Sequence, residues 1–508
     1  MMKKRLTILE QIAVDVEVSE NPFNFQLQDL FLMAARNNVK RAFLFVSKLL
    51  GKHIPVNPKR SILTGKLLGF LMNDKLNFRG QGYKGDDQTA GKIGGQSSKI
   101  ESENKSNVQL IARALRDDRY INEAMECCQN NLLTLDKPTL FIGFAETATA
   151  LGNSLFSQFK GENILYIHTT RDELIQCTSA FDFEEEHSHA TSHFCYPLRE
   201  NILRDYERIV LVDDEITTGK TALNLISAIN NKYPGKEYII VSILDWRREK
   251  HINEYKELER ELGVKIHEVS ILDGEAYCDS PSIKGIEIQY ENLNAVPKKK
   301  DIYEEFYNKG SLYKVSGTYI SSQEKDETLV RNYLFPIERS KNLTRNLTNG
   351  ELKDYKYLEL SGRFGVTAKE LQDVEETIDH IVKSIDEFSE KTLVLGTEEF
   401  MYIPMLIASN IKGAKYQSTT RSPIYASDEE GYGIKCAAIF TNPFDKKVIN
   451  YIYNVEKDVY DEVFFVTERE IDEESKQELT HLFQSVNINK INFLYFLPGH
   501  EEECSNEI

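Results

Sequence analysis

The stretch Arg208-Ile-Val-Leu-Val-Asp-Asp-Glu-Ile-Thr-Thr-Gly-Lys-Thr221 decides the fold of this 508-residue chain. Its apolar part, Ile209 to Val212, is rich in β-branched residues and too short for a helix, so it predicts a buried strand. Asp213 and Asp214 follow at the carboxyl end of that strand, where open α/β sheets place their ligands. Residues 222–226 then begin an amphipathic helix. The stretch therefore predicts a strand, a polar turn and a helix of an α/β domain.

The turn between this strand and this helix combines two chemical groups. Its second part is polar and contains a glycine; the residues are Thr217, Thr218, Gly219, Lys220 and Thr221. The helix N-terminus behind them has unpaired N–H groups that suit a phosphate. Two carboxylates beside a phosphate cradle favour a sugar 5-phosphate, which has vicinal hydroxyls. A P-loop is excluded, because it needs a glycine five residues before Gly219, where Asp214 stands.

This stretch resembles the phosphoribosyl-diphosphate signature of type I phosphoribosyltransferases: strand, two acids, hydrophobic residue, Thr-Thr-Gly and Thr. The resemblance implies that family's fold, a central parallel sheet flanked by helices, with a mobile hood. It also implies a Mg²⁺-dependent glycosyltransferase that uses or produces 5-phosphoribosyl diphosphate. Asp213 and Asp214 would hold ribose hydroxyls and stabilise developing positive charge, and Mg²⁺ would bridge ribose and diphosphate oxygens. A strand–loop–helix with a chance acidic pair is the structural alternative.

A second strand–turn–helix lies upstream, with an apolar strand at 139–145 and a helix beginning at 150–155. Its turn resembles the diphosphate-binding loop of the same family and contains Glu146, Thr147, Ala148 and Thr149. Glu146 is unusual beside an anion, and fits if Mg²⁺ intervenes or if the carboxylate contacts the nucleophile. Arg171 stands just past a further strand and suits a bidentate phosphate contact. An ion pair with Asp172 or Glu173 is its structural alternative.

A strand at residues 237–244 ends in Asp245, Trp246 and Arg247. This position resembles the one at which relatives contact the base. An aromatic face with an arginine suits a planar or anionic acceptor, so these three residues are predicted to bind a base-like acceptor. A tryptophan that only covers the sheet edge is the alternative.

Three other segments carry charge or lack apolar residues. Residues 27–50 have the apolar spacing of a helix and, with residues 51–53, contain Arg36, Lys40, Arg41, Lys48, Lys52 and His53. This predicts an anion-facing helix, with a solvated helix face as the alternative. Residues 79–106 predict a flexible insertion. His187, His189 and His193 beside three glutamates leave a metal site open, but the resemblance implies a hood that excludes water.

The last third of the chain echoes the first domain. Residues 391–399 mirror 138–146, and 416–421 mirror 166–171, whereas Thr467-Glu468-Arg469 replaces the aspartate pair. We therefore predict a second α/β domain that is a degenerate copy without the ribose-phosphate site; chance similarity is the alternative. The predicted division is a phosphoribosyltransferase-like domain at 1–290, a connecting region at 291–345 and a C-terminal domain at 346–508.

Thr420-Arg421-Ser422-Pro423 adds a resemblance that covers nearly the whole chain. With Gly362-Arg-Phe-Gly365, it resembles two-part proteins of bacterial tellurite-resistance and stress operons, which join a phosphoribosyltransferase-like domain to a TRSP domain. The resemblance implies synthesis or salvage of a nucleoside-like metabolite, with other enzymes of the operon as partners. A non-catalytic sensor of phosphoribosyl diphosphate or a nucleotide, or a scaffold in a stress-response complex, is the alternative function.

Composition excludes several classes of protein. The net charge of −18 implies no broad basic face and argues against non-specific binding of nucleic acid. No apolar run approaches a membrane span, and the N-terminus lacks a signal core. Seven cysteines without metal-type spacing predict reduced thiols and a cytoplasmic location. A homo-oligomer is expected.

Overall fold

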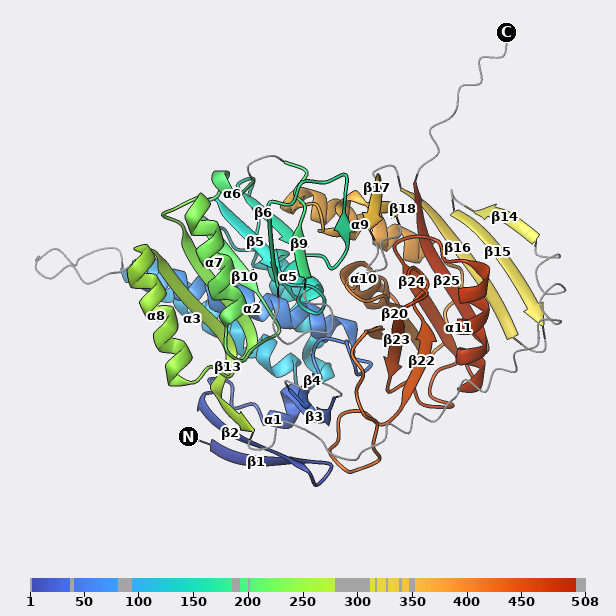
Figure 1. Cartoon of the computed structure of the whole chain (residues 1–508), viewed down its shortest axis with the longest axis horizontal. Helices are drawn as coiled ribbons and strands as arrows, with labels where there is room; N and C mark the ends of the chain where they lie inside the picture. The colour runs from blue at the N-terminus through green and yellow to red at the C-terminus, as the bar shows by residue number, and fades with distance from the viewer. Residues whose placement is uncertain are drawn as a thin grey trace, which may run out of the picture.

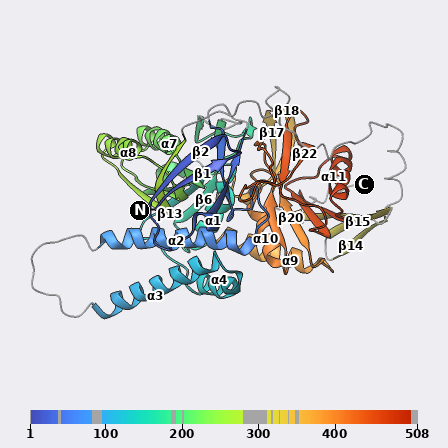
Figure 2. The ribbon, with the colours of Figure 1, turned by 90° about the horizontal axis from the view of Figure 1, so that it is seen from below.

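Two α/β halves lie side by side in the computed structural model of the chain (Figure 1). The structure describes residues 2–36, 41–80, 94–184, 192–199, 202–278, 311–315, 318–325, 328–337, 340–346 and 352–498. Each half is built on its own sheet, and the long helix α2 runs below the first half to reach α10 of the second (Figure 2).

The first sheet has a parallel centre and antiparallel edges. Its central order is β13-β12-β10-β5-β6, and all these neighbours are parallel. The β1-β2 hairpin extends it beside β13, and β19 pairs antiparallel with β6. The predicted parallel sheet is therefore the centre of a larger mixed sheet. Its strands are β1 (Met2–Ile8), β2 (Ile12–Glu20), β5 (Thr139–Gly143), β6 (Ile164–His168), β10 (Arg208–Val212), β11 (Glu215–Ile216), β12 (Glu237–Asp245), β13 (Lys265–Cys278) and β19 (Val366–Thr367).

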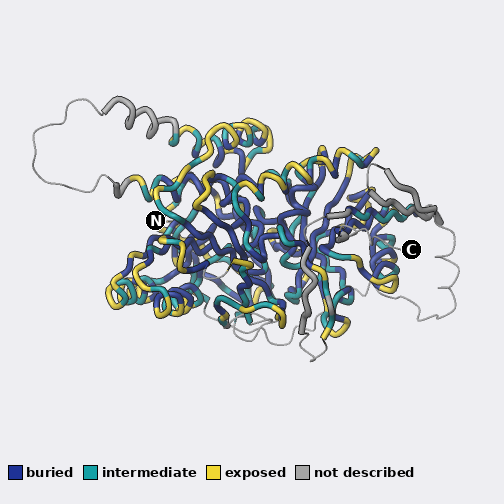
Figure 3. The backbone as a smooth tube through the Cα atoms, turned by 90° about the horizontal axis from the view of Figure 1, so that it is seen from above, coloured by how far each residue is buried: buried dark blue, intermediate teal, exposed yellow. Residues whose placement is uncertain are grey.

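Helices cover both faces of this sheet, which explains why its central strands are continuously apolar. Phe141 of β5 packs in the cluster formed with α2 and α5, whereas Leu140 and Ile142 pack in the cluster formed with α7 and α8. The strands accordingly form the buried interior of the molecule (Figure 3). The helices are α2 (Pro58–Gly80), α3 (Gly94–Ala114), η1 (Asp118–Tyr120), α4 (Ile121–Asn130), α5 (Ala148–Phe156), α6 (Ile202–Asp205), α7 (Lys220–Lys232) and α8 (Glu249–Leu262).

Residues 27–50 do not form the predicted helix. They contain a single turn, α1 (Leu27–Leu30), and a hairpin of β3 (Phe31–Ala35) and β4 (Phe43–Ser47). The aromatic residues of the hairpin pack on the sheet: the rings of Phe45 and Trp246 are stacked with centroids 5.3 Å apart. Tertiary packing of β-favouring residues therefore outweighs the helical spacing.

The predicted flexible insertion at 79–106 overlaps two helices, and its flexibility stays a prediction. Helix α2 continues to Gly80 and α3 begins at Gly94, while residues 81–93 lie outside the described residues. Ile100 is the single large apolar residue of α3 before Val108, so periodicity becomes visible only where the helix enters the core at Val108 and Ile111. Polar residues can form a helix without an apolar face to reveal it.

The second sheet has five parallel strands in the order β16-β25-β24-β20-β21, and β14 and β15 extend it antiparallel beside β16. Strands β14, β15 and β16, which lie in the predicted connecting region, thus belong to this sheet. The division of the chain into domains stays a prediction. The strands are β14 (Ser311–Val315), β15 (Thr318–Lys325), β16 (Thr328–Ile337), β20 (Thr392–Gly396), β21 (Lys415–Ser418), β24 (Glu462–Thr467) and β25 (Lys490–Pro498); the helices are α9 (Ala368–Lys383), α10 (Tyr402–Asn410) and α11 (Glu473–Ser485).

The second half repeats the topology of the first. Strands β21-β20-β24-β25 stand in the same order as β6-β5-β10-β12. The registers also agree, since Gly143 pairs with His168 as Gly396 pairs with Ser418. Helices α5 and α10 each have nine residues, and α7 and α11 each have thirteen. This agreement supports the reading of the second half as a degenerate copy.

Smaller elements complete the fold. They are β7 (Glu173–Leu174), β17 (Ser340–Asn346) and β18 (Leu352–Leu358) in one sheet, the pair β8 (Phe181–Glu184) and β9 (Ser192–Cys195), the pair β22 (Ala437–Thr441) and β23 (Ile449–Tyr453), and η2 (Glu359–Ser361). The β8-β9 hairpin occupies the predicted hood segment, whose residues 185–191 lie outside the described residues. The six cysteines in the described ranges are free thiols, and no helix there is long and apolar enough to cross a bilayer.

Candidate active site

Asp213 and Asp214 leave the sheet at the carboxyl end of β10. The loop is fixed on both sides: Phe144 N–H donates to Val212 O at 3.0 Å, and Asp213 N–H donates to Val241 O at 3.0 Å. Asp214 N–H donates to Asp213 Oδ1 at 2.9 Å. The next two residues form β11 and pair with β12. Neighbouring strands therefore hold the loop from which both carboxylates line one cavity.

Helix α7 begins at the same cavity. Gly219 is its N-cap with a φ of 71°, and the Tyr255 hydroxyl donates to Gly219 O at 2.7 Å. A Cβ at this position would clash with the Tyr255 ring. Thr217, Thr218 and Thr221 also line the cavity, whereas the Lys220 side chain is exposed and does not. The start of α7 thus presents backbone N–H groups and hydroxyls to a ligand.

The turn after β5 forms the opposite wall. Ala145, Glu146 and Thr147 line the cavity, but Ala148 and Thr149 are buried behind it. Lys52 Nζ lies 2.8 Å from Glu146 Oε2. Burial alone would raise the pKa of Glu146, but Lys52, Arg421 and Arg171 together lower it below its usual value. Glu146 is therefore an ionised carboxylate whose charge is neutralised by cations of the protein. This explanation differs from the two that the sequence suggested, a neighbouring Mg²⁺ or a contact with the nucleophile.

Arg171 contributes a guanidinium to this wall. Its Nη2 donates to Ala145 O at 3.2 Å, and its backbone N–H donates to Glu399 Oε2 at 3.1 Å. Its side chain therefore supports the turn after β5 and lines the cavity at the same time. The contact to Glu399 comes from the second half of the chain.

Basic residues of the β3-β4 hairpin and of the segment that follows it also reach the cavity. Arg36, Arg41, Lys52 and His53 line it, so this segment faces the site although it is not a helix. Arg41 Nη2 lies 2.6 Å from Glu215 Oε1. Burial and the adjacent Lys52 lower the pKa of His53 to about 3, so its imidazole is neutral near neutral pH.

The predicted acceptor residues Asp245, Trp246 and Arg247 do not line the cavity. Trp246 is 1% exposed and packs against Phe31 and Phe45 of the hairpin. Arg247 Nη2 lies 2.6 Å from Asp245 Oδ2, so each charge has a partner. The tryptophan covers the sheet, and acceptor binding by these residues stays a prediction that their surroundings do not favour.

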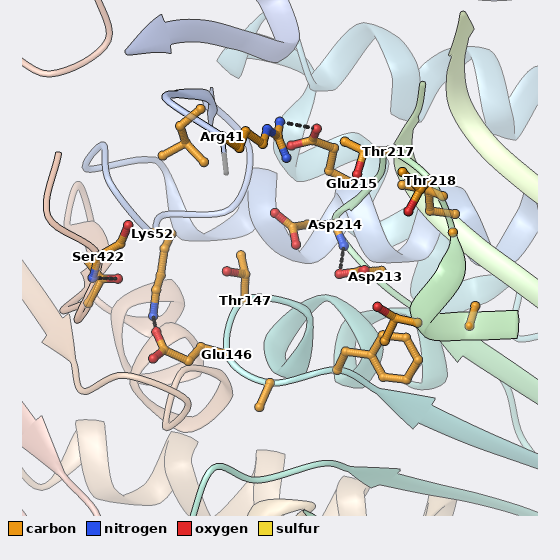
Figure 4. Close-up of a pocket in the computed structure, with 18 of the residues that line it drawn as sticks. Arg41, Lys52, Glu146, Thr147, Asp213, Asp214, Glu215, Thr217, Thr218 and Ser422 are labelled. Atoms are coloured by element: carbon orange, nitrogen blue, oxygen red, sulfur yellow. Dashed lines mark hydrogen bonds and ion pairs between the residues drawn. The ribbon is translucent and has the colours of Figure 1, made fainter. Parts of the chain in front are cut away.

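Together these walls enclose a cavity of about 230 Å³. Asp213 and Asp214 lie on one side, Lys52 and Glu146 on the other, and Thr147 between them (Figure 4). Three residues of the second half, Thr420, Arg421 and Ser422, complete the lining. Sequence reasoning did not assign these three to a site, although the Thr-Arg-Ser-Pro motif contains them.

The cavity fits Mg²⁺ that is shared with a phosphorylated ligand. Within the described ranges, no group of three or more His, Cys, Asp or Glu residues could hold a metal by itself. Mg²⁺ bound to phosphates typically takes only one or two protein carboxylates, which Asp213 and Asp214 could provide. His193 is 1% exposed and its Nδ1 lies 2.9 Å from Thr169 Oγ1; His187 and His189 lie outside the described residues.

Two protein-family models match the chain, one in each half. Residues 30–275 match the family described as Phosphoribosyl transferase, PRTase_2. Residues 360–483 match the family described as TRSP domain C terminus to PRTase_2. The chain therefore carries a PRTase_2 phosphoribosyltransferase domain followed by a TRSP domain.

Two solved structures show weak similarity. Adenine phosphoribosyltransferase from Saccharomyces cerevisiae is 14% identical over 32% of this chain and 78% of that chain, with a TM-score of 0.17. Adenine phosphoribosyltransferase from Leishmania donovani is 18% identical over 38% of this chain and 75% of that chain, with a TM-score of 0.18. No curated protein matches the chain.

Proposed function

We propose that the protein transfers a phosphoribosyl group between diphosphate and a base-like acceptor in a nucleoside-like metabolite pathway, in either direction. One observation carries this proposal. The carboxylate pair after β10 and the N-terminus of α7 line the same cavity as the cation-supported turn after β5. These parts suit a ribose with a phosphate at one end and a diphosphate at the other.

The 5-phosphate would bind at the start of α7. Thr217, Thr218 and Thr221 offer hydroxyls there, and the helix terminus offers N–H groups without intrahelical partners. The helix dipole adds partial positive charge at this end. Because Gly219 has no side chain, Tyr255 can pack against the turn and hold its backbone for the phosphate.

Asp213 and Asp214 would bind the 2- and 3-hydroxyls of the ribose. As the bond between the anomeric carbon and the leaving oxygen breaks, positive charge develops on the ribose ring. Two carboxylates held close to that ring stabilise this charge, and fixed charges in a water-poor site act without reorganisation. The first-half strands that clamp this loop keep the carboxylates in place before the substrate arrives.

The diphosphate would lie against the turn after β5, near Lys52 and Arg171. When bound, Mg²⁺ supplies charge neutralisation of the leaving diphosphate. Glu146 holds the Lys52 ammonium at this wall rather than contacting the anion. Arg36, Arg41, Leu44 and His53 also line the cavity, and we assign the acceptor to these residues because the phosphate, the ribose and the diphosphate are placed elsewhere.

Labelled 5-phosphoribosyl diphosphate tests this proposal. The protein is incubated with it, Mg²⁺ and a metabolite extract, and release of diphosphate with formation of a new labelled riboside is expected. The double variant Asp213→Asn, Asp214→Asn should lose at least about a hundredfold in rate, as expected when charge stabilisation is removed. Tight binding without turnover across extracts would instead support a sensor, and activity retained by the double variant would overturn the assigned site.

A further inference from the structure

The carboxyl edges of the two sheets face each other across the cavity. The turn after β21, residues 419–423, is the counterpart of the turn that contains Arg171, yet it lines the cavity of the first half. The contact is reciprocal. Glu399, the counterpart of Glu146, accepts from Thr170 Oγ1 at 2.5 Å and from Arg171 N–H at 3.1 Å. Each half therefore supports the other half's turns.

At the corresponding edge of the second half, acidic side chains pair with an arginine of the same half. Glu468 stands where Asp214 stands in the first half, since Val466 follows the same register as Val212. Arg363 fills the space beside it, with Nη1 2.7 Å from Glu468 Oε1 and Nη2 3.0 Å from Glu399 Oε1. Buried ion pairs therefore join these acids to Arg363.

The Thr420–Ser422 segment is held in place before any ligand binds. Thr420 N–H donates to Tyr451 O at 3.1 Å, and Tyr451 N–H donates to Thr420 O at 2.8 Å. The Tyr453 hydroxyl donates to Ser422 O at 2.7 Å. A segment fixed on a rigid sheet loses little conformational entropy when it binds a ligand.

Arg421 keeps one donor group for a ligand. Its Nε and Nη2 donate to the two carboxylate oxygens of Glu398 at 2.7 and 2.6 Å. Its Nη1 has no hydrogen-bond partner among the described residues, and Ser422 Oγ is buried with none there either. Arg421 also lowers the pKa of Glu146, so the positive charge of Arg421 acts on a residue that lines the cavity.

We propose that Arg421 and Ser422 bind the diphosphate of the substrate, an inference that rests on the function proposed above. The C-terminal half then completes the active site within one chain. Lys52, Arg171 and Arg421 line this part of the cavity and would surround the diphosphate, which has more anionic oxygens to contact than a single phosphate. The acidic neighbours Glu146 and Glu398 pair with Lys52 and Arg421 and hold these two cations beside the cavity.

Binding to the full-length protein tests the proposal, with 5-phosphoribosyl diphosphate, inorganic diphosphate and ribose 5-phosphate as separate probes in the presence of Mg²⁺. Arg421→Gln should weaken binding of the first two about 10- to 100-fold, the usual effect of a hydrogen bond to a charged group. Ribose 5-phosphate has no diphosphate, so its affinity should change less than about twofold. Arg421→Lys should recover part of the lost affinity.

Arg208→Gln is the matched control. Arg208 is a buried arginine in ion pairs with Glu237 and Asp136, at the opposite end of β10. The Arg208→Gln variant should have a lower melting temperature without a selective loss of diphosphate binding. Unchanged diphosphate affinity in both Arg421 variants, or equal weakening of all three probes, would overturn the role of Arg421. A wild-type protein that binds neither phosphorylated ribose would instead overturn the proposed function.

Discussion

Lys52 Nζ lies 2.8 Å from Glu146 Oε2 and donates to Glu398 O at 2.9 Å. One ammonium therefore ties the turn after β5 to the turn after β20. The Lys52 side chain is only 3% exposed, so the charge is held away from water. This contact couples the integrity of the cavity wall to the packing of the two halves.

Lys52→Met tests this coupling. Removing the ammonium leaves Glu146 buried without its nearest cation, and breaking a buried ion pair typically costs about 3–5 kcal/mol. We expect a lower free energy of unfolding in urea and weaker binding of inorganic diphosphate. Lys160→Met, at an exposed site, should change neither quantity. Full stability in Lys52→Met would show that Arg421 and Arg171 suffice to neutralise Glu146.

Asp273 predicts a pH dependence of stability. Burial, followed by the charges of Asp245 and Glu20, raises the pKa of Asp273 to about 7. The unfolded chain releases this proton near pH 4, so the unfolded state binds fewer protons between these two values and stability falls as pH rises through this window. Asp273→Asn should therefore stabilise the protein near pH 8, by at most about 4 kcal/mol.

Urea unfolding of wild type and Asp273→Asn at several pH values checks this expectation. The difference in unfolding free energy between the two proteins should shrink as pH falls from about 8 to about 5, because the carboxyl becomes protonated in the folded state. A difference that does not depend on pH would show that Asp273 does not titrate in this range.

Gly219→Ala should damage the phosphate cradle. The new Cβ would meet the Tyr255 ring, and the φ of 71° is unfavourable for alanine. We expect a loss of about 1–3 kcal/mol in stability and at least tenfold weaker binding of ribose 5-phosphate. Gly263→Ala is the control, since Gly263 has a φ of 63° but no atom near the new Cβ. Equal effects in both variants would attribute the change to backbone strain alone.

Trp246→Phe separates packing from acceptor binding. Trp246 is the single tryptophan of the chain, and its ring stacks on Phe45. We expect a stability loss of about 1–3 kcal/mol, typical of a reshaped core contact, with the acceptor KM changed less than about twofold. A selective rise in the acceptor KM at unchanged stability would restore the acceptor assignment of this residue.

Sequence alone determined the local units. One contiguous stretch contains the strand Arg208 to Val212, the two acids after it and the helix that begins near Thr221. Its periodicity and turn residues could therefore be recognised without knowing which other segments it contacts. The correspondence of Gly143 with Gly396, and of Arg171 with Arg421, could be recognised from the sequence for the same reason. These local patterns sufficed to predict the fold class and one wall of the site.

Only the tertiary structure decided which units meet. Phe31 and Phe45 form a hairpin because the sheet offers Trp246 to pack on, and that same packing withdraws Trp246 from the cavity. Lys52 and Arg421 reach the cavity because two carboxyl edges face each other, and this joins residues as far apart in sequence as Thr149 and Glu399. Such contacts depend on how two hydrophobic cores pack, and no local pattern encodes that geometry.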